Sequence, residues 1–256
     1  MTLIPNSIVK STRVNPKTMV LFAKPKVGKT EMCAGLPNSL LIDLEDGSEF
    51  VDAVKVNIKA EAAKSKKTDL EVVQEVIAEL KQANAEKGGY AFKYGILDTV
   101  TAVEEMVLPI ARNMYVNTPQ GRNFQGSDVR TLPNGAGYQY TREALWMFIN
   151  MFRELFDTLI IIGHLKDKLI EKDGKEMNER GLDLAGKSSS LLCSQVDAIG
   201  YIYRDADGDT AINFKPSEST TCGSRSEHLK NQENIKVITK NEDGSLKVDW
   251  SKIFID

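Results

Sequence analysis

Residues 19–32, MVLFAKPKVGKTEM, place a flexible turn and a Lys-Thr pair between an apolar run and a helical segment. A phosphate cradle needs a buried strand, a turn whose backbone N–H groups converge, and a helix start that points at the anion. Gly28 lets the backbone approach a phosphate, Lys29 can reach the β and γ phosphates, and the Thr30 hydroxyl can join a magnesium shell. We therefore predict that ATP or ADP and Mg²⁺ bind at a phosphate loop made of Ala23, Lys24, Pro25, Lys26, Val27, Gly28, Lys29 and Thr30.

The first position of this phosphate loop is Ala23, whereas the common pattern G-x-x-x-x-G-K-[ST] begins with glycine. That residue turns the chain and does not itself need to lie against phosphate, so alanine is compatible with the pattern. The alternative is a lysine-rich surface turn that reads Gly-Lys-Thr by chance.

A second apolar run, YGILD, ends in Asp98. A magnesium-dependent phosphoryl site needs an acidic residue at the end of a buried strand near the phosphate loop. We therefore expect Asp98 and Thr30 to hold the metal. The alternative is that Asp98 caps the helix that begins near Val100, and one residue can do both.

Three carboxylates, Asp43, Glu45 and Asp46, lie at the carboxyl end of the apolar run that begins at Ser39, in the segment LLIDLEDGSEF. Hydrolysis needs a group that polarises the attacking water, and ligands in open α/β sheets sit at the carboxyl ends of strands. Glu45 is the predicted general base and Asp43 is the second candidate. The alternative is an acidic, solvated turn that contains Asp46 and Gly47.

The apolar run TLIIIG is predicted to end as a strand at Gly163, directly before His164. Beside the Asp98 strand, His164 would face the γ-phosphate and report its presence to the segment that follows. The alternative is a hydrogen-bonded structural histidine.

Apolar runs of strand length alternate with longer segments of helical period, which predicts an α/β fold with a mostly parallel central sheet and helices on both faces. Amphipathic helices are predicted from Asp69 to Gly88-Gly89 and from Thr141 to Phe156. Residues 197–215 alternate around Asp207-Gly208 and predict a β-hairpin. The polar tail beyond it ends in an apolar segment that is predicted to dock.

The chain has 256 residues, which we interpret as one domain, with a core at 17–204 and a C-terminal hairpin and tail at 198–256. Its net charge of −3 excludes a globally basic nucleic-acid-binding protein, so any such contact must be local. Neither a signal peptide nor a membrane-spanning run is found in the sequence. The cysteines are odd in number and far apart, which favours reduced thiols, so we expect a soluble, cytoplasmic protein; they are Cys33, Cys193 and Cys222.

The segments AKPKVGKT, LIDLEDG, ILDT and IIIGHLKDK, in this order, resemble the RecA-like P-loop ATPases. More narrowly, the chain resembles the compact phage-encoded RecA-like proteins of single-strand annealing and recombination, from about Lys17 to about Arg204. The resemblance implies that Glu45 activates water and that His164 senses nucleotide. It also implies a homo-oligomer that acts on single-stranded DNA, with a single-strand DNA-binding protein as a possible partner and the host cytoplasm as the location if the protein is phage-encoded.

In that family, two mobile loops contact DNA, and the matching segments here are 115–140 and 165–190. Both mix basic residues with glycines, and the first adds aromatic rings suited to base stacking. In the second, acidic residues nearly cancel the lysines. The alternative for both segments is an ordinary lid or a subunit contact. The candidate DNA-contacting residues are Arg122, Phe124, Arg130, Lys166 and Lys168.

RecA-like sites are usually completed by a cation from a neighbouring subunit, and Arg204, Arg225 and Lys230 are the candidates. Two other functions stay open at this point. A small-molecule kinase would need an acceptor pocket and usually an arginine-rich lid, and the segment after His164 is poor in arginine. A nucleotide-binding assembly protein would hold ATP without turnover.

Overall fold

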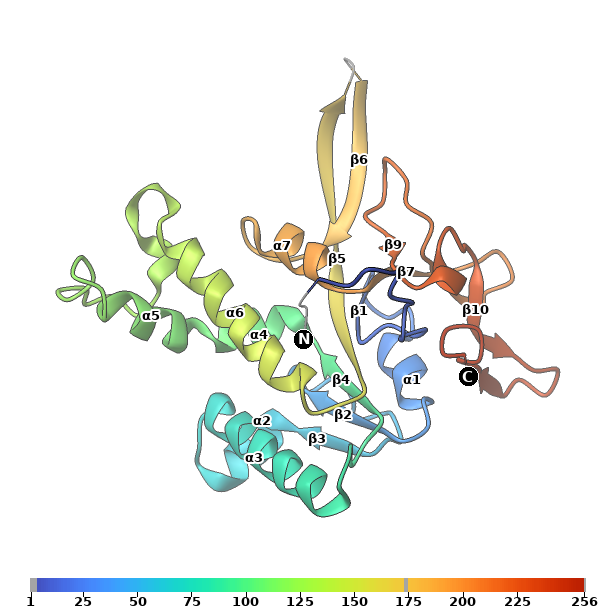
Figure 1. Cartoon of the computed structure of the whole chain (residues 1–256), viewed down its shortest axis with the longest axis horizontal. Coiled ribbons are helices and arrows are strands. Elements are labelled where there is room, and N and C mark those ends of the chain that lie inside the picture. Colours follow the sequence, from blue (N-terminus) through green and yellow to red (C-terminus); the bar gives the residue numbers. More distant parts are fainter. Residues whose placement is uncertain (1–3, 173–174, 256) are drawn as a thin grey trace.

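The computed structural model describes residues 4–172 and 175–255. Its strands form one mixed sheet (Figure 1). They are β1 (Thr18–Ala23), β2 (Ser39–Asp43), β3 (Lys55–Asn57), β4 (Tyr94–Asp98), β5 (Thr158–Lys172), β6 (Lys175–Leu182), β7 (Ala198–Arg204), β8 (Thr210–Asn213), β9 (Gly223–Ser224), β10 (Ile235–Lys240) and β11 (Leu246–Val248).

The strand order is β11-β10-β8-β7-β1-β5-β4-β2-β3, with β6 paired to β5 and β9 paired to β7 outside that path. The six strands from β7 to β3 run parallel, which confirms the predicted mostly parallel sheet. Strands β1, β2 and β4 are buried along their whole length because both faces of the sheet are covered. The register pairs Ala23 with His164 and Asp43 with Asp98, so these residues meet at one edge of the sheet.

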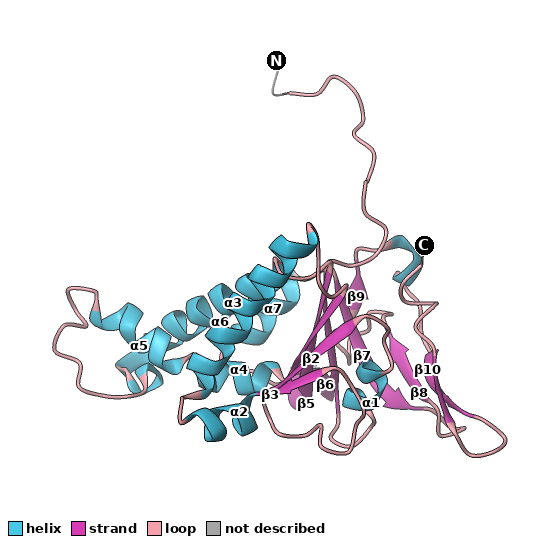
Figure 2. Ribbon diagram, turned by 90° about the horizontal axis from the view of Figure 1, so that it is seen from below, coloured by secondary structure: helices cyan, strands magenta, loops and turns pink. Residues whose placement is uncertain are grey.

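Helices lie on both faces of the sheet, although unevenly (Figure 2). One apolar cluster joins α2, α3, α4, α6 and α7 to one face, whereas α1 and the C-terminal segment cover the other. None of the helices in the described residues is long and apolar enough to cross a membrane. The helices are α1 (Lys29–Ala34), α2 (Ile58–Ser65), α3 (Asp69–Lys87), α4 (Val100–Met106), α5 (Leu108–Val116), α6 (Gly137–Arg153) and α7 (Ser188–Gln195), with 3-10 turns η1 (Val129–Thr131), η2 (Pro133–Gly135) and η3 (Glu227–Leu229).

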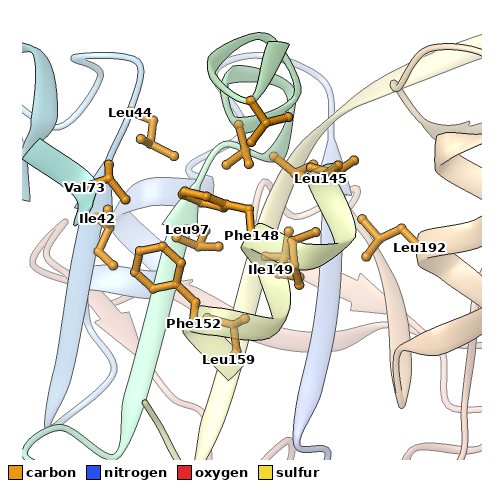
Figure 3. Close-up of a cluster of buried hydrophobic side chains, with 14 of the residues drawn as sticks. Ile42, Leu44, Val73, Leu97, Leu145, Phe148, Ile149, Phe152, Leu159 and Leu192 are labelled. Carbon is orange, nitrogen blue, oxygen red and sulfur yellow. The ribbon is translucent and has the colours of Figure 1, made fainter. Parts of the chain in front are cut away.

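The larger core lies between α6 and the sheet. Figure 3 shows Phe148 and Phe152 of α6 directed at Ile42 and Leu97 of the strands, and all four side chains are fully buried. Burying such side chains supplies most of the favourable free energy of folding, at roughly 25 cal/mol per Å² of apolar surface. The stripe of apolar residues on α6 therefore holds the helical layer on the sheet.

Helix α3 confirms the predicted amphipathic helix. Thr68 and Glu71 form a reciprocal capping box at its start, and Gly88 ends it with a left-handed φ of 67°. The second predicted helix was placed too late in the chain, because α6 begins at Gly137 and ends before Phe156. Phe156 is nevertheless fully buried, which explains why it continued the apolar pattern.

The predicted end of the fourth strand at Gly163 was wrong. Strand β5 continues to Lys172 and pairs antiparallel with β6, so residues predicted to be a loop form a β-hairpin, the β5–β6 arm, that projects from the sheet (Figure 1). The sequence did not predict this arm because its residues are mostly polar and form no apolar run. Backbone hydrogen bonds between the two strands hold the arm together. Residues 173–174 at its tip lie outside the described residues.

The C-terminal region contains the predicted hairpin, formed by β7 and β8 around Asp207-Gly208. The tail holds more structure than we predicted, because β10 and β11 extend the sheet antiparallel beyond β8. The structure confirms the prediction that the apolar segment at the end of the tail docks on the rest of the protein. Trp250 is only 5% exposed and donates a hydrogen bond from its indole Nε1 to the Met32 carbonyl of α1, at 2.9 Å.

We predict that Trp250→Ala lowers the free energy of unfolding by about 3–5 kcal/mol, because it removes a buried ring and a hydrogen bond to α1. Urea denaturation measures this change. The control is Leu246→Ala on exposed β11, which should change the free energy by less than about 1 kcal/mol. Equal, small changes in both variants would show that the C-terminal segment does not stabilise the fold.

Candidate functional site

The phosphate loop joins β1 to α1 at the edge where the parallel strands end. Ala23 is the last residue of β1, fully buried and in strand pairing, so its methyl group fits without a left-handed backbone. The left-handed positions fall later, at Lys26 with a φ of 64° and Gly28 with a φ of 94°. Gly28 is also the residue before α1, as a loop that turns its N–H groups toward an anion requires.

Lys29 lies inside the loop and not on its surface. Its side chain is 8% exposed, and its Nζ donates to the Lys24 carbonyl at 3.3 Å. Burial lowers the pKa of Lys29, while the nearby charges of Asp98 and Glu45 act to raise it. The ammonium group is thus held where phosphate oxygens could replace the Lys24 carbonyl as acceptors.

The residues predicted to hold magnesium are in direct contact. The Thr30 hydroxyl donates to Asp98 Oδ2 at 2.6 Å, and Asp98 is only 5% exposed. Burial raises the pKa of Asp98, and the neighbouring carboxylates add to the rise, although the Thr30 hydrogen bond opposes it. A buried carboxylate beside a hydroxyl fits a hard cation with oxygen ligands, so this pair suits Mg²⁺.

The alternative role of Asp98 as a helix cap does not hold. The side chain that accepts from the start of α4 is that of Thr99, from the Ala102 N–H. Thr99 also donates its hydroxyl hydrogen to Glu45, so it connects the metal-site strand with the predicted general base. We missed Thr99 in the sequence, although its place directly after Asp98 could have suggested a site residue.

Asp43 builds the turn that carries Glu45. Its fully buried carboxylate accepts four backbone N–H groups and the Ser48 hydroxyl, from Glu45, Asp46, Gly47 and Ser48. Burial alone would raise the pKa of Asp43, but these hydrogen bonds outweigh it and hold the pKa below its ordinary value. Every oxygen is engaged within the turn, so this structural role replaces the second-candidate assignment of Asp43 as the base.

Glu45 and His164 meet across the sheet edge, although they are 119 positions apart in the chain. His164 Nε2 lies 3.1 Å from Glu45 Oε1 and 3.2 Å from Oε2. The Glu45 side chain is 33% exposed, so it stays accessible to solvent. The structure therefore brings the predicted general base and the predicted sensor into one hydrogen-bonded pair.

A cleft of about 890 Å³ borders Glu45 on the side of α3 and α4. Leu44, Leu70 and Met106 line it together with Glu45, and polar groups from both helices complete its wall. Water can therefore reach the Glu45 carboxylate from this side.

Of the predicted subunit-bridging cations, Arg204 lies beside the phosphate loop of its own chain. Its Nη1 donates to the Gly208 carbonyl at 2.9 Å, and a Cβ atom at Gly28 would lie 3.8 Å from its Nη2. Thr210, which the sequence did not suggest, donates to the Val27 carbonyl at 3.3 Å. The turn between β7 and β8 thus packs against the phosphate loop.

Arg225 and Lys230 do not approach the loop of their own chain. Arg225 contacts Asp197 at 3.4 Å, and Asp197 accepts from the N–H groups of Lys17 and Thr18 at the opposite end of β1. Lys230 pairs with Glu227, three positions earlier in the chain.

In the first predicted DNA loop, two of the candidate side chains make contacts within the protein. Arg130 pairs with Asp128 and Glu105, and these carboxylates raise its pKa further above the ordinary arginine value. Phe124 packs edge-on against Tyr115, with ring centroids 5.4 Å apart. Arg130 and Phe124 thus have partners within the chain, whereas Arg122 is exposed, and DNA contact by these residues stays a prediction.

In the second predicted DNA loop, Lys166 and Lys168 are strand residues of the β5–β6 arm. Both are exposed, and Lys166 pairs with Asp183 at 2.9 Å. Alternation places them on one face of the ribbon, while Asp167 and Arg180 occupy the other. Glu179 lies opposite Lys168 and Arg180 lies opposite Asp167, so each face of the ribbon carries charges of both signs.

We predict that Asp43→Asn destabilises the protein by about 1–3 kcal/mol, because an amide nitrogen would face backbone donors. The carboxylate is favoured in the folded state, so its contribution is present above the unfolded pKa and disappears as the pH falls below about 4. Urea denaturation across this pH range should show the difference from wild type shrinking in acid. The exposed Asp52→Asn is the control, and a difference that persists in acid would contradict the assignment.

Comparison with known proteins fits this geometry. No protein with a curated description matches the chain. A family model described as an AAA domain matches residues 15–226, which include the phosphate loop, Glu45, Asp98 and His164. Because the match covers most of the chain, the protein belongs to this AAA-domain family of P-loop ATPases.

Proposed function

We propose that this protein is a magnesium-dependent ATPase that uses hydrolysis of the γ-phosphate to act on single-stranded DNA in recombination, annealing or replication, as a cytoplasmic homo-oligomer of phage type. The observation that carries the proposal is the contact between Glu45 and His164, because it ties a water-activating carboxylate to the strand that becomes the β5–β6 arm. The resemblance to RecA-like proteins supports DNA as the polymer.

In the proposed reaction, Lys29 and the loop N–H groups bind the β and γ phosphates. Thr30 and Asp98 would hold Mg²⁺, which neutralises phosphate charge when bound. Glu45 takes a proton from water as the water oxygen bonds to the γ-phosphorus, and the bond to the ADP oxygen breaks. Thr99 holds the Glu45 carboxylate in place for this transfer.

His164 also provides a route from nucleotide to the β5–β6 arm. The His164 carbonyl accepts from the Asp183 N–H at 2.9 Å, just beyond the end of β6. A γ-phosphate that draws His164 away from Glu45 would therefore act on both strands at the base of the arm. This route supports an ATPase whose turnover responds to a ligand on that side of the sheet.

We predict that Glu45→Gln keeps ATP affinity but lowers turnover about 10²–10⁴-fold, because a carboxamide cannot accept the proton. The exposed Glu49→Gln, on the same loop, is the matched control and should keep normal turnover. Lys29→Ala should abolish nucleotide binding. Steady-state phosphate release and titration with a fluorescent ADP measure these effects.

Unchanged ATP hydrolysis in Lys29→Ala would refute the ATPase proposal. Equal loss of binding and turnover in Glu45→Gln would remove Glu45 as the base. Tight ATP binding by the wild-type protein without any turnover would favour a nucleotide-holding assembly protein instead.

We predict that single-stranded DNA stimulates ATP hydrolysis at low salt, where phosphate contacts are strongest. His164→Ala should reduce this stimulation by a larger factor than it reduces turnover without DNA, since it breaks the link to the arm. Phosphate release with and without an oligonucleotide tests both statements. An equal reduction in the two rates would remove the coupling role of His164.

A further inference from the structure

A groove formed by β6, β7 and β8 carries aromatic and basic side chains that the proposed ATPase chemistry does not use. It measures about 710 Å³. Its lining residues belong to the base of the β5–β6 arm, to β7, to β8 and to the segment before β10. Its principal lining residues are Arg180, Tyr201, Tyr203, Arg204, Asn213 and Asn234.

Two tyrosine rings lie in the groove as a stacked pair. Tyr201 and Tyr203 occupy alternate positions of β7 and so share one face, with ring centroids 5.7 Å apart and ring planes 17° apart. Phe22 of β1 packs against Tyr201 at 5.6 Å, which anchors the pair on the core. Both tyrosines stay partly exposed, although burying them would be favourable.

Arg180 of β6 extends this aromatic surface. Its guanidinium lies 5.8 Å from the centre of the Tyr201 ring, within the range of a cation–π contact. The Arg180 backbone also bonds to Ser219 and Thr221, which holds this part of the arm beside β7. Arginine and tyrosine faces together form a flat, rigid surface suited to planar ligands.

Charged side chains of both signs surround the groove. Glu233 pairs with Lys215 at 3.1 Å, whereas Asp205 shares Lys236 with Asp207 and Asp209. Arg180, the basic side chain beside the tyrosine rings, lies 3.8 Å from Asp167. The groove thus matches planar rings first, and Arg180 is the cation that a phosphate group beside those rings could contact.

We propose that this groove binds unpaired bases of single-stranded DNA, with Tyr203 and Tyr201 stacking on bases and Arg180 facing the phosphates. Stacking on aromatic side chains combined with basic groups is the usual physical basis of sequence-tolerant binding to single strands. The choice of DNA as the polymer rests on the proposed function. Arg204, which also lies beside Gly28, places one end of the groove next to the phosphate loop.

The test measures fluorescence anisotropy of a labelled oligothymidylate of about 15 nucleotides at low salt with ADP present. Tyr203→Ala should weaken binding about tenfold, because one stacked base loses its partner. Tyr203→Phe, which keeps the ring, should stay within about twofold of wild type. Tyr90→Ala removes an exposed tyrosine outside the groove and is the matched control, with unchanged affinity expected.

A second probe separates base stacking from backbone attraction. An abasic oligonucleotide of the same length should bind wild type and Tyr203→Ala equally, because it offers phosphates and no bases. Arg180→Gln should instead weaken both probes and reduce the salt dependence of binding by about one phosphate contact.

Equal affinity of wild type and Tyr203→Ala for the oligothymidylate would overturn this inference while leaving the proposed DNA-dependent ATPase intact. Weaker binding of fluorescent ADP in Tyr203→Ala, with oligonucleotide binding unchanged, would also overturn it, since the ring would then serve the adenine. Failure of the wild-type protein to bind any oligonucleotide would reject DNA as the polymer in both proposals. Glu45→Gln, assayed in parallel, should bind the oligothymidylate normally, which separates binding from hydrolysis.

Discussion

The candidate site depends on the insertion of β5 between β1 and β4. Parallel strands present their carboxyl ends at one edge of a sheet, and this insertion places His164 beside Ala23 and carries the Asp98 strand one step away from the phosphate loop. The space opened above β5 is where Lys29, Asp98 and Glu45 face one another. Had β1 and β4 paired directly, Glu45 and His164 could not meet.

Negative charge exceeds positive charge at this edge of the sheet, which suits a cation and adds to the effect of burial on the pKa of Asp98. Asp98 and Glu45 both lie near the buried ammonium group of Lys29. Burial of Asp98 raises the pKa of its carboxyl group. The pKa of Asp43 is not raised in the same way, because its turn supplies five hydrogen-bond donors to the carboxylate. At this edge, the Asp43 carboxylate is fully hydrogen-bonded within the protein. The charge of the Asp98 carboxylate, in contrast, would be better balanced by a divalent cation.

The sequence was sufficient for features encoded locally. Continuous apolar runs predicted the buried strands, and the Gly-Lys-Thr loop lies where the pattern placed it. It was insufficient where pairing or contact is set by distant residues. The β5–β6 arm has polar residues on both faces, so neither an apolar run nor an alternation marked it. Likewise, Glu105 of α4, which pairs with Arg130, and Gly28, which lies beside Arg204, are distant in the chain from these arginines, so composition alone did not indicate either contact.

Gly163 lies in close contact with the end of β6. A Cβ atom at this position would lie 2.1 Å from Leu182 Cδ1, so a larger residue here would force the Leu182 side chain to move. Close packing transmits displacement because such an interface deforms little. His164 follows Gly163 on β5, and its carbonyl accepts from the Asp183 N–H at the end of β6, so a movement of His164 on nucleotide binding would reach the base of the arm. The strand that carries His164 is paired with the strand that carries Arg180 over the Tyr201 ring, which joins the two proposed sites through one hairpin.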